Sequence, residues 1–329
     1  MCCSAASSWR SPAATATSPD AAAIVHTRRI GSLDVSAVGL GCNNFGWRID
    51  EQASHAVIDA ALAAGVTFFD TADMYGDGLS EEYLGRALLR RRGDVVIATK
   101  FGHRSGHPDR GAHPAHIRRA VEASLQRLQT DWIDLYQLHT PDPLVPIAET
   151  LGALDELVAA GKVREIGCSN FSLAQLAEAD GVTTPNGMRF ESVQNQFSML
   201  ERDEAPVVAA CERQERAFLP YFPLANGMLT GKYRVGRDAP PGTRITDGGR
   251  YAPFLNDANL AVVERIAHFA ESRGAGVLDA TFAWLLSHRA VASVIAGATK
   301  PHQVTANAAA SDWQLSAADR AELDSMLSS

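Results

Sequence analysis

Four residues of types that move protons stand at or just after the ends of predicted strands. Asp70 ends FFD, Tyr75 follows in the turn MYGDG, Lys100 ends VVIATK and His139 ends DLYQLH. A buried lysine needs a partner because an unpaired ammonium is costly to desolvate, and Asp70 can supply it. A free tyrosine titrates near about 10, and we expect the Lys100 cation to lower the pKa of Tyr75. This set can deliver a proton to a carbonyl oxygen that His139 steers.

Amide and aromatic side chains follow the next strands along the chain. Ser169 and Asn170 follow IGC, Gln194 ends SVQ, and Tyr221 lies in YFP. Serine, asparagine and glutamine offer donors and acceptors that suit an amide, and an aromatic face suits a planar ring. The proton-moving set holds no reductant, so a cofactor that carries hydride is required. Each of these residues alone is ordinary at the end of a strand. Their joint occurrence at the same ends of consecutive strands is what indicates an active site.

The elements that would position these residues alternate between strands and helices from Ile30 onward. The predicted strands are Val35–Gly41, Thr67–Asp70, Val95–Lys100, Ile133–Leu138, Val163–Cys168, Phe190–Gln194, Ala217–Phe222 and Ala292–Ala296. Eight strands, most of them followed by a helix, predict an α/β protein that closes into one (β/α)8 TIM barrel over residues 26–329. An open doubly wound sheet is the alternative. In a barrel, the active site lies at the C-terminal ends of the strands.

Composition restricts the class of protein and its partners. The 329 residues are 46% hydrophobic and 21% charged, which is ordinary for a soluble globular chain. A net charge of −8 disfavours nucleic acid and anionic membrane surfaces. Five cysteines without a CxxC pair favour a reducing, cytoplasmic location over a disulfide framework. Residues 1–25 lack the apolar core of a signal peptide, and we expect a disordered tail there. The expected partner is a small molecule, and the oligomeric state stays open.

The motifs together resemble the aldo-keto reductase family. The resemblance runs from about Thr27 to about Leu327 and rests on DTADMYGDGLSEEYLG, IATKFG, YQLHTPD, GCSNF, VQNQFSMLER, YFPLANGMLTGKY and GATKPHQVTANAAA. It implies a catalytic tetrad of Asp70, Tyr75, Lys100 and His139, with Tyr75 as the proton donor. It also implies that Ser169, Asn170 and Gln194 hold the nicotinamide carboxamide and that Tyr221 stacks on the nicotinamide ring.

The phosphate end of the cofactor needs a site other than a Rossmann loop. GLGCNNFG has Asn44 where the third glycine of that fingerprint should stand. Residues 226–250 carry five basic and two acidic side chains, a local charge of +3, and could cover a pyrophosphate or form a mobile solvated loop. The resemblance implies that Leu224, Gly227 and Leu229 cover the pyrophosphate.

GATKPHQVTAN opens a helix after the last strand, which favours phosphate binding through free N–H groups and the helix dipole. By resemblance, the 2′-phosphate and adenine are surrounded by Gly297, Ala298, Thr299, Lys300, Gln303 and Asn307. Gln303 stands where arginine is frequent in the family. Lys300 can still pair with a 2′-phosphate, so NADP is favoured and NAD is possible.

Two further groups of residues have open interpretations. Phe45, Trp47 and Met74 follow the first two strands and either line the substrate pocket or pack in the core. His103, His107, His113 and His116 cluster around Asp109, but proline and glycine interrupt the spacing, so we predict a solvated loop and no metal site.

The sequence therefore predicts an NADP-dependent oxidoreductase that reduces aldehydes or ketones to alcohols. One alternative is an NAD(P)-dependent sugar or alcohol dehydrogenase. Another, taken from relatives in the family, is a cofactor-sensing regulatory subunit with incidental turnover. The physiological substrate is not predicted because variable pocket loops determine it.

Overall fold

The computed structural model describes residues 25–103, 111–247 and 249–328. The prediction of a disordered tail over residues 1–25 lies outside the described residues, apart from Val25. The described chain begins with an antiparallel hairpin of β1 (Thr27–Ile30) and β2 (Leu33–Ser36). Gly31 permits the turn between them because its φ of 53° is one that side-chain-bearing residues rarely adopt.

Eight parallel strands form a sheet in the order β10-β3-β4-β5-β6-β7-β8-β9. They are β3 (Val38–Gly41), β4 (Phe68–Asp70), β5 (Val96–Phe101), β6 (Ile133–Leu138), β7 (Val163–Ser169), β8 (Ser192–Gln194), β9 (Ala217–Phe218) and β10 (Val294–Gly297). Phe218 joins the two edges: its N–H donates to the Ala290 carbonyl at 2.7 Å, and its carbonyl accepts from the Ala292 N–H at 3.1 Å. The sheet is therefore closed, which confirms the (β/α)8 barrel and rules out the open doubly wound sheet.

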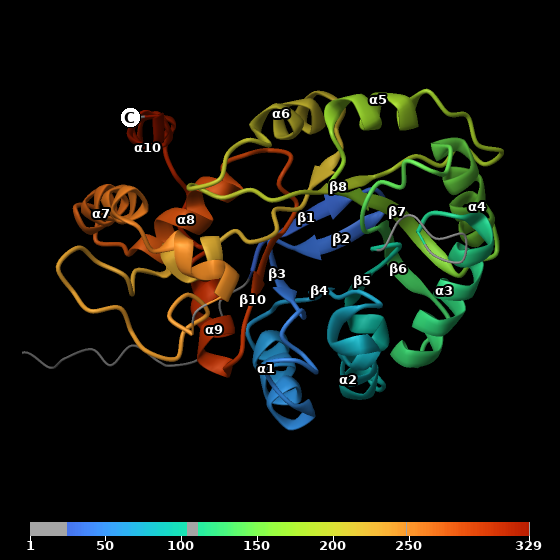
Figure 1. Ribbon diagram of the computed structural model, residues 1–329, viewed down its shortest axis with the longest axis horizontal. Helices are drawn as coiled ribbons and strands as arrows, with labels where there is room; N and C mark the ends of the chain where they lie inside the picture. Colours follow the sequence, from blue (N-terminus) through green and yellow to red (C-terminus); the bar gives the residue numbers. More distant parts are fainter. Residues whose placement is uncertain (1–24, 104–110, 248, 329) are drawn as a thin grey trace, which may run out of the picture.

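Helices surround the barrel, as Figure 1 shows. They are α1 (Glu51–Ala63), α2 (Leu79–Leu88), α3 (Pro114–Leu128), α4 (Ile147–Ala159), α5 (Leu173–Asp180), α6 (Ala205–Arg213), α7 (Asp257–Glu271), α8 (Val277–Leu286), α9 (Pro301–Ala309) and α10 (Ala317–Ser328). Short 3-10 turns include η1 (Tyr75–Gly78), η2 (Arg92–Asp94), η3 (Ala225–Thr230) and η4 (Gly249–Phe254). Among the described residues, no helix combines the length and apolar character that a membrane span requires.

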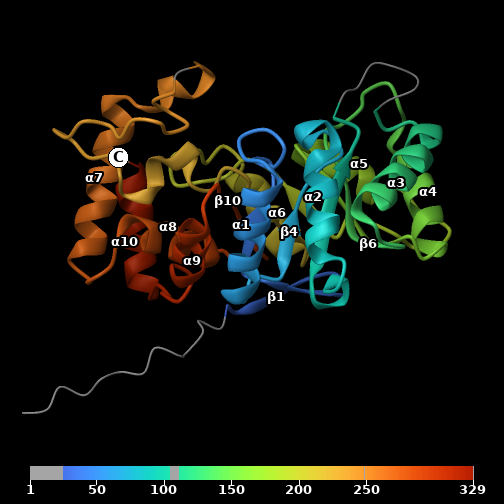
Figure 2. The ribbon, with the colours of Figure 1, turned by 90° about the horizontal axis from the view of Figure 1, so that it is seen from below.

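Side-chain alternation divides the barrel interior into layers. Phe68, Ala98 and Leu135 share an apolar cluster with Ile30 and Leu33 of the hairpin, which therefore closes the end from which the strands start. Figure 2 shows the hairpin at that end and the orange segment before α7 at the other. Two residues further along β4, β5 and β6 stand Asp70, Lys100 and Gln137. The period of two places these polar residues inside the barrel as well, one layer closer to the C-terminal ends.

Several predicted strands are shorter in the structure, two of them by three or more residues. The predicted strand Val35–Gly41 is interrupted at Ala37, so its first residues belong to the hairpin and only Val38–Gly41 to the barrel. The Ser36 hydroxyl fixes this break by donating to the Val38 carbonyl at 2.7 Å. The predicted strand Ala217–Phe222 ends at Phe218, and Phe222 has a φ of 50°, which is incompatible with a strand.

Candidate active site

Lys100 and Asp70 form a buried ion pair inside the barrel. Lys100 Nζ lies 2.7 Å from Asp70 Oδ2 and 2.9 Å from the Thr71 carbonyl oxygen, and its side chain is 1% exposed. Burial lowers the pKa of Lys100, but its electrostatic interactions and hydrogen bonds with Asp70 and Tyr75 together outweigh burial, and the net pKa is raised. Lys100 is therefore a cation at neutral pH, fixed in position by Asp70.

Tyr75 begins the turn η1 next to this pair. Lys100 Nζ lies 5.2 Å from the centroid of the Tyr75 ring. The turn that presents Tyr75 needs left-handed backbone at Gly76 (φ 58°) and Asp77 (φ 55°). Burial raises the pKa of Tyr75, Lys100 lowers it and Asp70 raises it, with a net increase. Lys100 therefore lowers the pKa of Tyr75 as expected, but desolvation outweighs the lysine cation and the net pKa is raised.

His139 faces Tyr75 from the end of β6. The two ring centroids are 6.0 Å apart at an interplanar angle of 84°. Burial lowers the pKa of His139 to about 2, and the positive charges of Lys100 and His103 add to this effect. A neutral imidazole can hydrogen-bond a carbonyl oxygen without competing for its proton. Nδ1 of His139 is buried and has no partner among the described residues.

The predicted carboxamide residues meet at the ends of β7 and β8. Ser169 Oγ donates to the Gln194 carbonyl at 2.7 Å, and Asn170 Nδ2 donates to the His139 carbonyl at 2.9 Å. The Tyr221 hydroxyl donates to Asn170 Oδ1 at 2.9 Å, which ties the predicted stacking residue to this group. Gln194 Nε2 donates to Asp70 Oδ1 at 2.9 Å. Through Gln194, the predicted carboxamide residues are therefore connected by a hydrogen bond to the Lys100–Asp70 ion pair. The positions of these residues at strand ends do not by themselves reveal that connection.

The segment after β9 folds onto the loop between β3 and α1. Arg244 Nη2 donates to Asn44 Oδ1 at 2.8 Å, and Arg48 pairs with Asp247 at 3.0 Å. Burial lowers the pKa of Lys232, and nearby Arg244 and Arg48 lower it further, so three cations gather beside Asn44. Asn44 also donates to the Ala298 carbonyl at 3.2 Å, which brings the cations to the end of β10.

The residues predicted to cover a pyrophosphate lie in or next to η3. Leu224 precedes it, Gly227 is half-buried with a φ of 103°, and Leu229 is fully buried in the core. Asn226, which the sequence reasoning missed, is 8% exposed, and neither polar atom of its amide has a partner among the described residues. A buried amide without partners is a natural point of contact for a ligand oxygen. Its φ of 59° is the signal that could have singled it out.

The N-terminus of α9 is capped by the side chain of Gln303, a residue of the same helix. Gln303 Oε1 accepts from the N–H groups of Thr299 at 2.8 Å and Lys300 at 3.2 Å. The expectation of free N–H groups is therefore wrong for these two residues. Gly297 and Lys300 are exposed beside this cap, and Asn307 is buried on the same helix.

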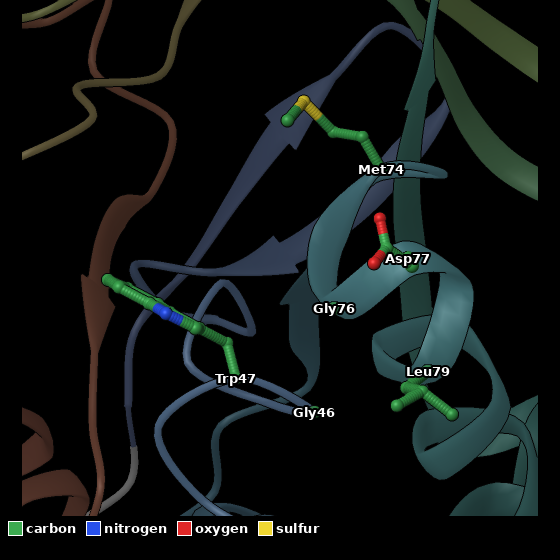
Figure 3. A pocket seen from close by; sticks show the side chains of 6 residues that line it. All are labelled: Gly46, Trp47, Met74, Gly76, Asp77 and Leu79. Atoms are coloured by element: carbon green, nitrogen blue, oxygen red, sulfur yellow. The ribbon is translucent and has the colours of Figure 1, made fainter.

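Two cavities open next to Tyr75. One, of about 370 Å³, is shown in Figure 3 with Trp47 across the opening from Met74 and Asp77. A second, of about 360 Å³, is lined by Asp73, Met74, Asp77, Gly102, His103, Gly111 and His116. Trp47 and Met74 line these cavities, whereas Phe45 is fully buried in the main core.

The predicted histidine cluster is only partly described. His107 and Asp109 lie outside the described residues, while His103 and His116 line the second cavity. Within the described part of the chain, no group of three or more histidine, cysteine, aspartate or glutamate side chains could hold a metal ion.

The chain is similar to known proteins over most of its length. A family model described as "Aldo/keto reductase family" matches residues 37–328. The aldo-keto reductase YhdN of Bacillus subtilis is 35% identical over 309 residues, which cover 90% of this chain and 91% of that protein. An aldo-keto reductase of Schizosaccharomyces pombe, yakc, whose name includes NADP(+), is 35% identical over 274 residues, 80% of each chain.

Solved structures show the same likeness. A glycerol dehydrogenase of Gluconobacter oxydans superposes with a TM-score of 0.79 at 31% identity, covering 92% of this chain and 95% of that one. An aldo/keto reductase of Klebsiella pneumoniae in complex with NADP and acetate superposes with a TM-score of 0.73 at 29% identity, with the same coverage.

Proposed function

Because the chain belongs to the aldo/keto reductase family, whose members are oxidoreductases acting on carbonyl and alcohol groups, we propose that it reduces aldehydes or ketones with NADPH and that Tyr75 donates the proton. The observation that carries the proposal is the buried Lys100–Asp70 pair beside Tyr75. Two buried charges are costly to desolvate, and a pair that only stabilised the fold could be replaced by apolar side chains.

The residues present fit a nicotinamide dinucleotide with a 2′-phosphate. NADPH, when bound, supplies the hydride. Ser169, Asn170 and Gln194 would hold the carboxamide, and Tyr221 would stack on the nicotinamide ring. Asn226 and Gly227 offer a buried amide and a cradle without a Cβ for the pyrophosphate, with Lys232 and Arg244 supplying positive charge.

Each member of the tetrad has a distinct task in the reduction. Neutral His139 orients the carbonyl oxygen toward Tyr75. As the carbonyl carbon gains hydride, the oxygen takes the phenolic proton of Tyr75, and the products are an alcohol and a tyrosinate. Lys100 stabilises the tyrosinate, Asp70 holds Lys100, and water then returns a proton to Tyr75.

NADP is proposed over NAD on three grounds. The Klebsiella structure holds NADP, the Schizosaccharomyces relative carries NADP(+) in its name, and Lys300 is exposed next to the capped helix. The Gluconobacter relative is named a glycerol dehydrogenase, which favours alcohol oxidation as a second candidate. The same residues would then act in reverse, with tyrosinate as the base.

Turnover of NADPH and NADH against a panel of aldehydes and ketones tests the proposal. Tyr75→Phe is expected to lower kcat by about 10²- to 10⁴-fold, the usual contribution of a general acid, and to leave NADPH binding intact. Tyr136→Phe is the matched control, because the buried Tyr136 hydroxyl has no partner among the described residues. Equal activity of wild type and Tyr75→Phe would overturn the assignment of the proton donor.

A further inference from the structure

We propose that Gln137 is a positioning residue that holds Asp70, and through it Lys100 and Tyr75, in their reactive arrangement. The inference deepens the function proposed above and rests on it for the role of Tyr75. Gln137 stands on β6, two residues before His139, and its side chain is fully buried. It touches neither cavity beside Tyr75, so it cannot act by binding the substrate there.

The Asp70 carboxylate divides its two oxygens between different partners. Oδ2 accepts from Lys100. Oδ1 accepts from Gln194 Nε2 at 2.9 Å and from Gln137 Nε2 at 3.4 Å. The two glutamines therefore fix the rotation of the carboxylate about its bond to the chain, and that rotation determines where Oδ2 holds the ammonium of Lys100.

The sheet register places Gln137 between Lys100 and Gly167. Lys100 pairs with Gln137, Gln137 with Gly167, and Gly167 with Ser192, so these residues form one layer across β5 to β8. A Cβ at Gly167 would lie 3.1 Å from Gln137 Cγ and would collide with Ser192 Oγ. Gly167 thus leaves the space in which the long side chain of Gln137 lies.

A structural role alone does not account for a glutamine here. Gln137 Oε1 is buried and has no partner among the described residues. An unsatisfied buried oxygen is unfavourable, and an apolar side chain of similar length would avoid it. What Gln137 supplies and an apolar residue could not is the N–H group directed at Asp70.

The sign of the effect on Tyr75 follows from electrostatics. Asp70 raises the pKa of Tyr75, and Lys100 lowers it. Amide donors offset part of the negative charge of Asp70, so removing one of them should raise the pKa of Tyr75 and make it a weaker acid. The other groups that face Tyr75 are Cys42, His139 and Tyr221, and the substitution leaves them unchanged.

Gln137→Met tests the inference because it keeps the length of the side chain and removes the donor. We expect kcat for carbonyl reduction to fall about threefold to tenfold, the effect of losing one weak hydrogen bond to a charged group. The alkaline limb of the kcat–pH profile should move to higher pH. KM for the carbonyl and Kd for NADPH should stay within about twofold, because Gln137 lines neither cavity and is not among the residues proposed to hold NADPH.

Ser192→Ala is the matched control, since Ser192 lies in the same layer and its hydroxyl has no hydrogen-bond partner among the described residues. It should leave the pH profile unchanged. If Gln137→Met does not fold, Gln137→Glu keeps the side-chain shape and places a carboxylate beside Asp70, which should move the alkaline limb further in the same direction. An alkaline limb that stays at the wild-type position in whichever variant folds would overturn the inference.

A readout that needs no turnover separates this inference from the proposed function. The ¹³Cζ shift of Tyr75 can be followed with pH in the cofactor-free protein, using Tyr75→Phe to assign the signal. A later titration of Tyr75 in Gln137→Met supports the positioning role even if no carbonyl is reduced, and unchanged titration refutes it even if wild type is active.

Discussion

Lys100 Nζ and Asp70 Oδ2 lie 2.7 Å apart inside the barrel, with side chains only 1% and 5% exposed. The pair joins β5 to the neighbouring strand β4, so the charge that acts on Tyr75 is held by the barrel itself. Its position on two strands makes the ion pair part of the fold as well as part of the site.

Lys100→Met should destabilise the protein and abolish most activity. It leaves the Asp70 carboxylate buried and unpaired, which typically costs about 3–5 kcal/mol of unfolding free energy. The double variant Asp70→Asn/Lys100→Met removes both charges and should recover most of that stability while remaining inactive. Urea unfolding and NADPH turnover measure the two effects. Equal stability of the single and double variants would show that the charge of Asp70 is not the source of the loss.

Acid should destabilise the protein through His139. Its pKa is lowered from 6.5 to about 2 in the fold, so the unfolded chain binds the proton more readily. The stability that neutral His139 contributes is complete above about pH 6.5 and falls by about 1.4 kcal/mol for each pH unit below it. His139→Gln should unfold with a shallower pH dependence between pH 7 and pH 5. Parallel pH dependences of wild type and His139→Gln would exclude His139 as the cause.

Gln303→Glu should keep the cap on helix α9 while changing the preference between NADPH and NADH. A glutamate at this position keeps an acceptor for the N–H groups of Thr299 and Lys300 and places negative charge at the N-terminus of α9, which favours the helix. Thermal stability should hold or rise. Affinity for NADPH should fall about tenfold through repulsion of the 2′-phosphate, and affinity for NADH should change little.

Titration of intrinsic fluorescence with each cofactor measures the two affinities, with Gln303→Ala as the control that removes the cap without adding charge. Equal losses for NADPH and NADH in Gln303→Glu would place the 2′-phosphate elsewhere.

Gly167→Ala should act on Tyr75 although it lies two strands beyond Lys100. The added methyl group collides with Ser192 and presses on Gln137, which should cost about 1–3 kcal/mol of unfolding free energy. It should also move the alkaline limb of the kcat–pH profile in the same direction as Gln137→Met. Gly152→Ala is the control: nothing lies within 4 Å of its added Cβ on α4, and stability should rise slightly. Independent, additive effects of Gly167→Ala and Gln137→Met would argue that the two residues do not act together.

Much of the fold, and the pairing of Lys100 with Asp70, is predictable because strand ends carry strong local signals. Asp70, Lys100 and His139 each close an apolar run, and the need of a buried lysine for a carboxylate indicates the pairing that the structure shows. Strand ends do not indicate Gln137, because it lies within β6 and not after it. The alternation that places Leu135 and His139 on one side of β6 also places Gln137 there.

Other features depend on contacts that the sequence does not specify locally. The Arg244–Asn44 hydrogen bond joins residues 200 positions apart through a long segment with little regular structure. The Tyr75 pKa depends on how far burial outweighs Lys100, which only the packed site determines. The cap formed by Gln303 follows from its spacing of three residues from Lys300, a signal present in the sequence but interpreted there as a cofactor contact.

The hairpin β1–β2 blocks access to Tyr75 from one end of the barrel. Ile30, Leu33 and Val35 fill the end where the strands start, so any molecule that reacts at Tyr75 must arrive and depart at the opposite end. The segment joined to Asn44 and Arg48 lies at that same end. Under the function proposed above, reactant, product and nucleotide would therefore share one route into and out of the barrel.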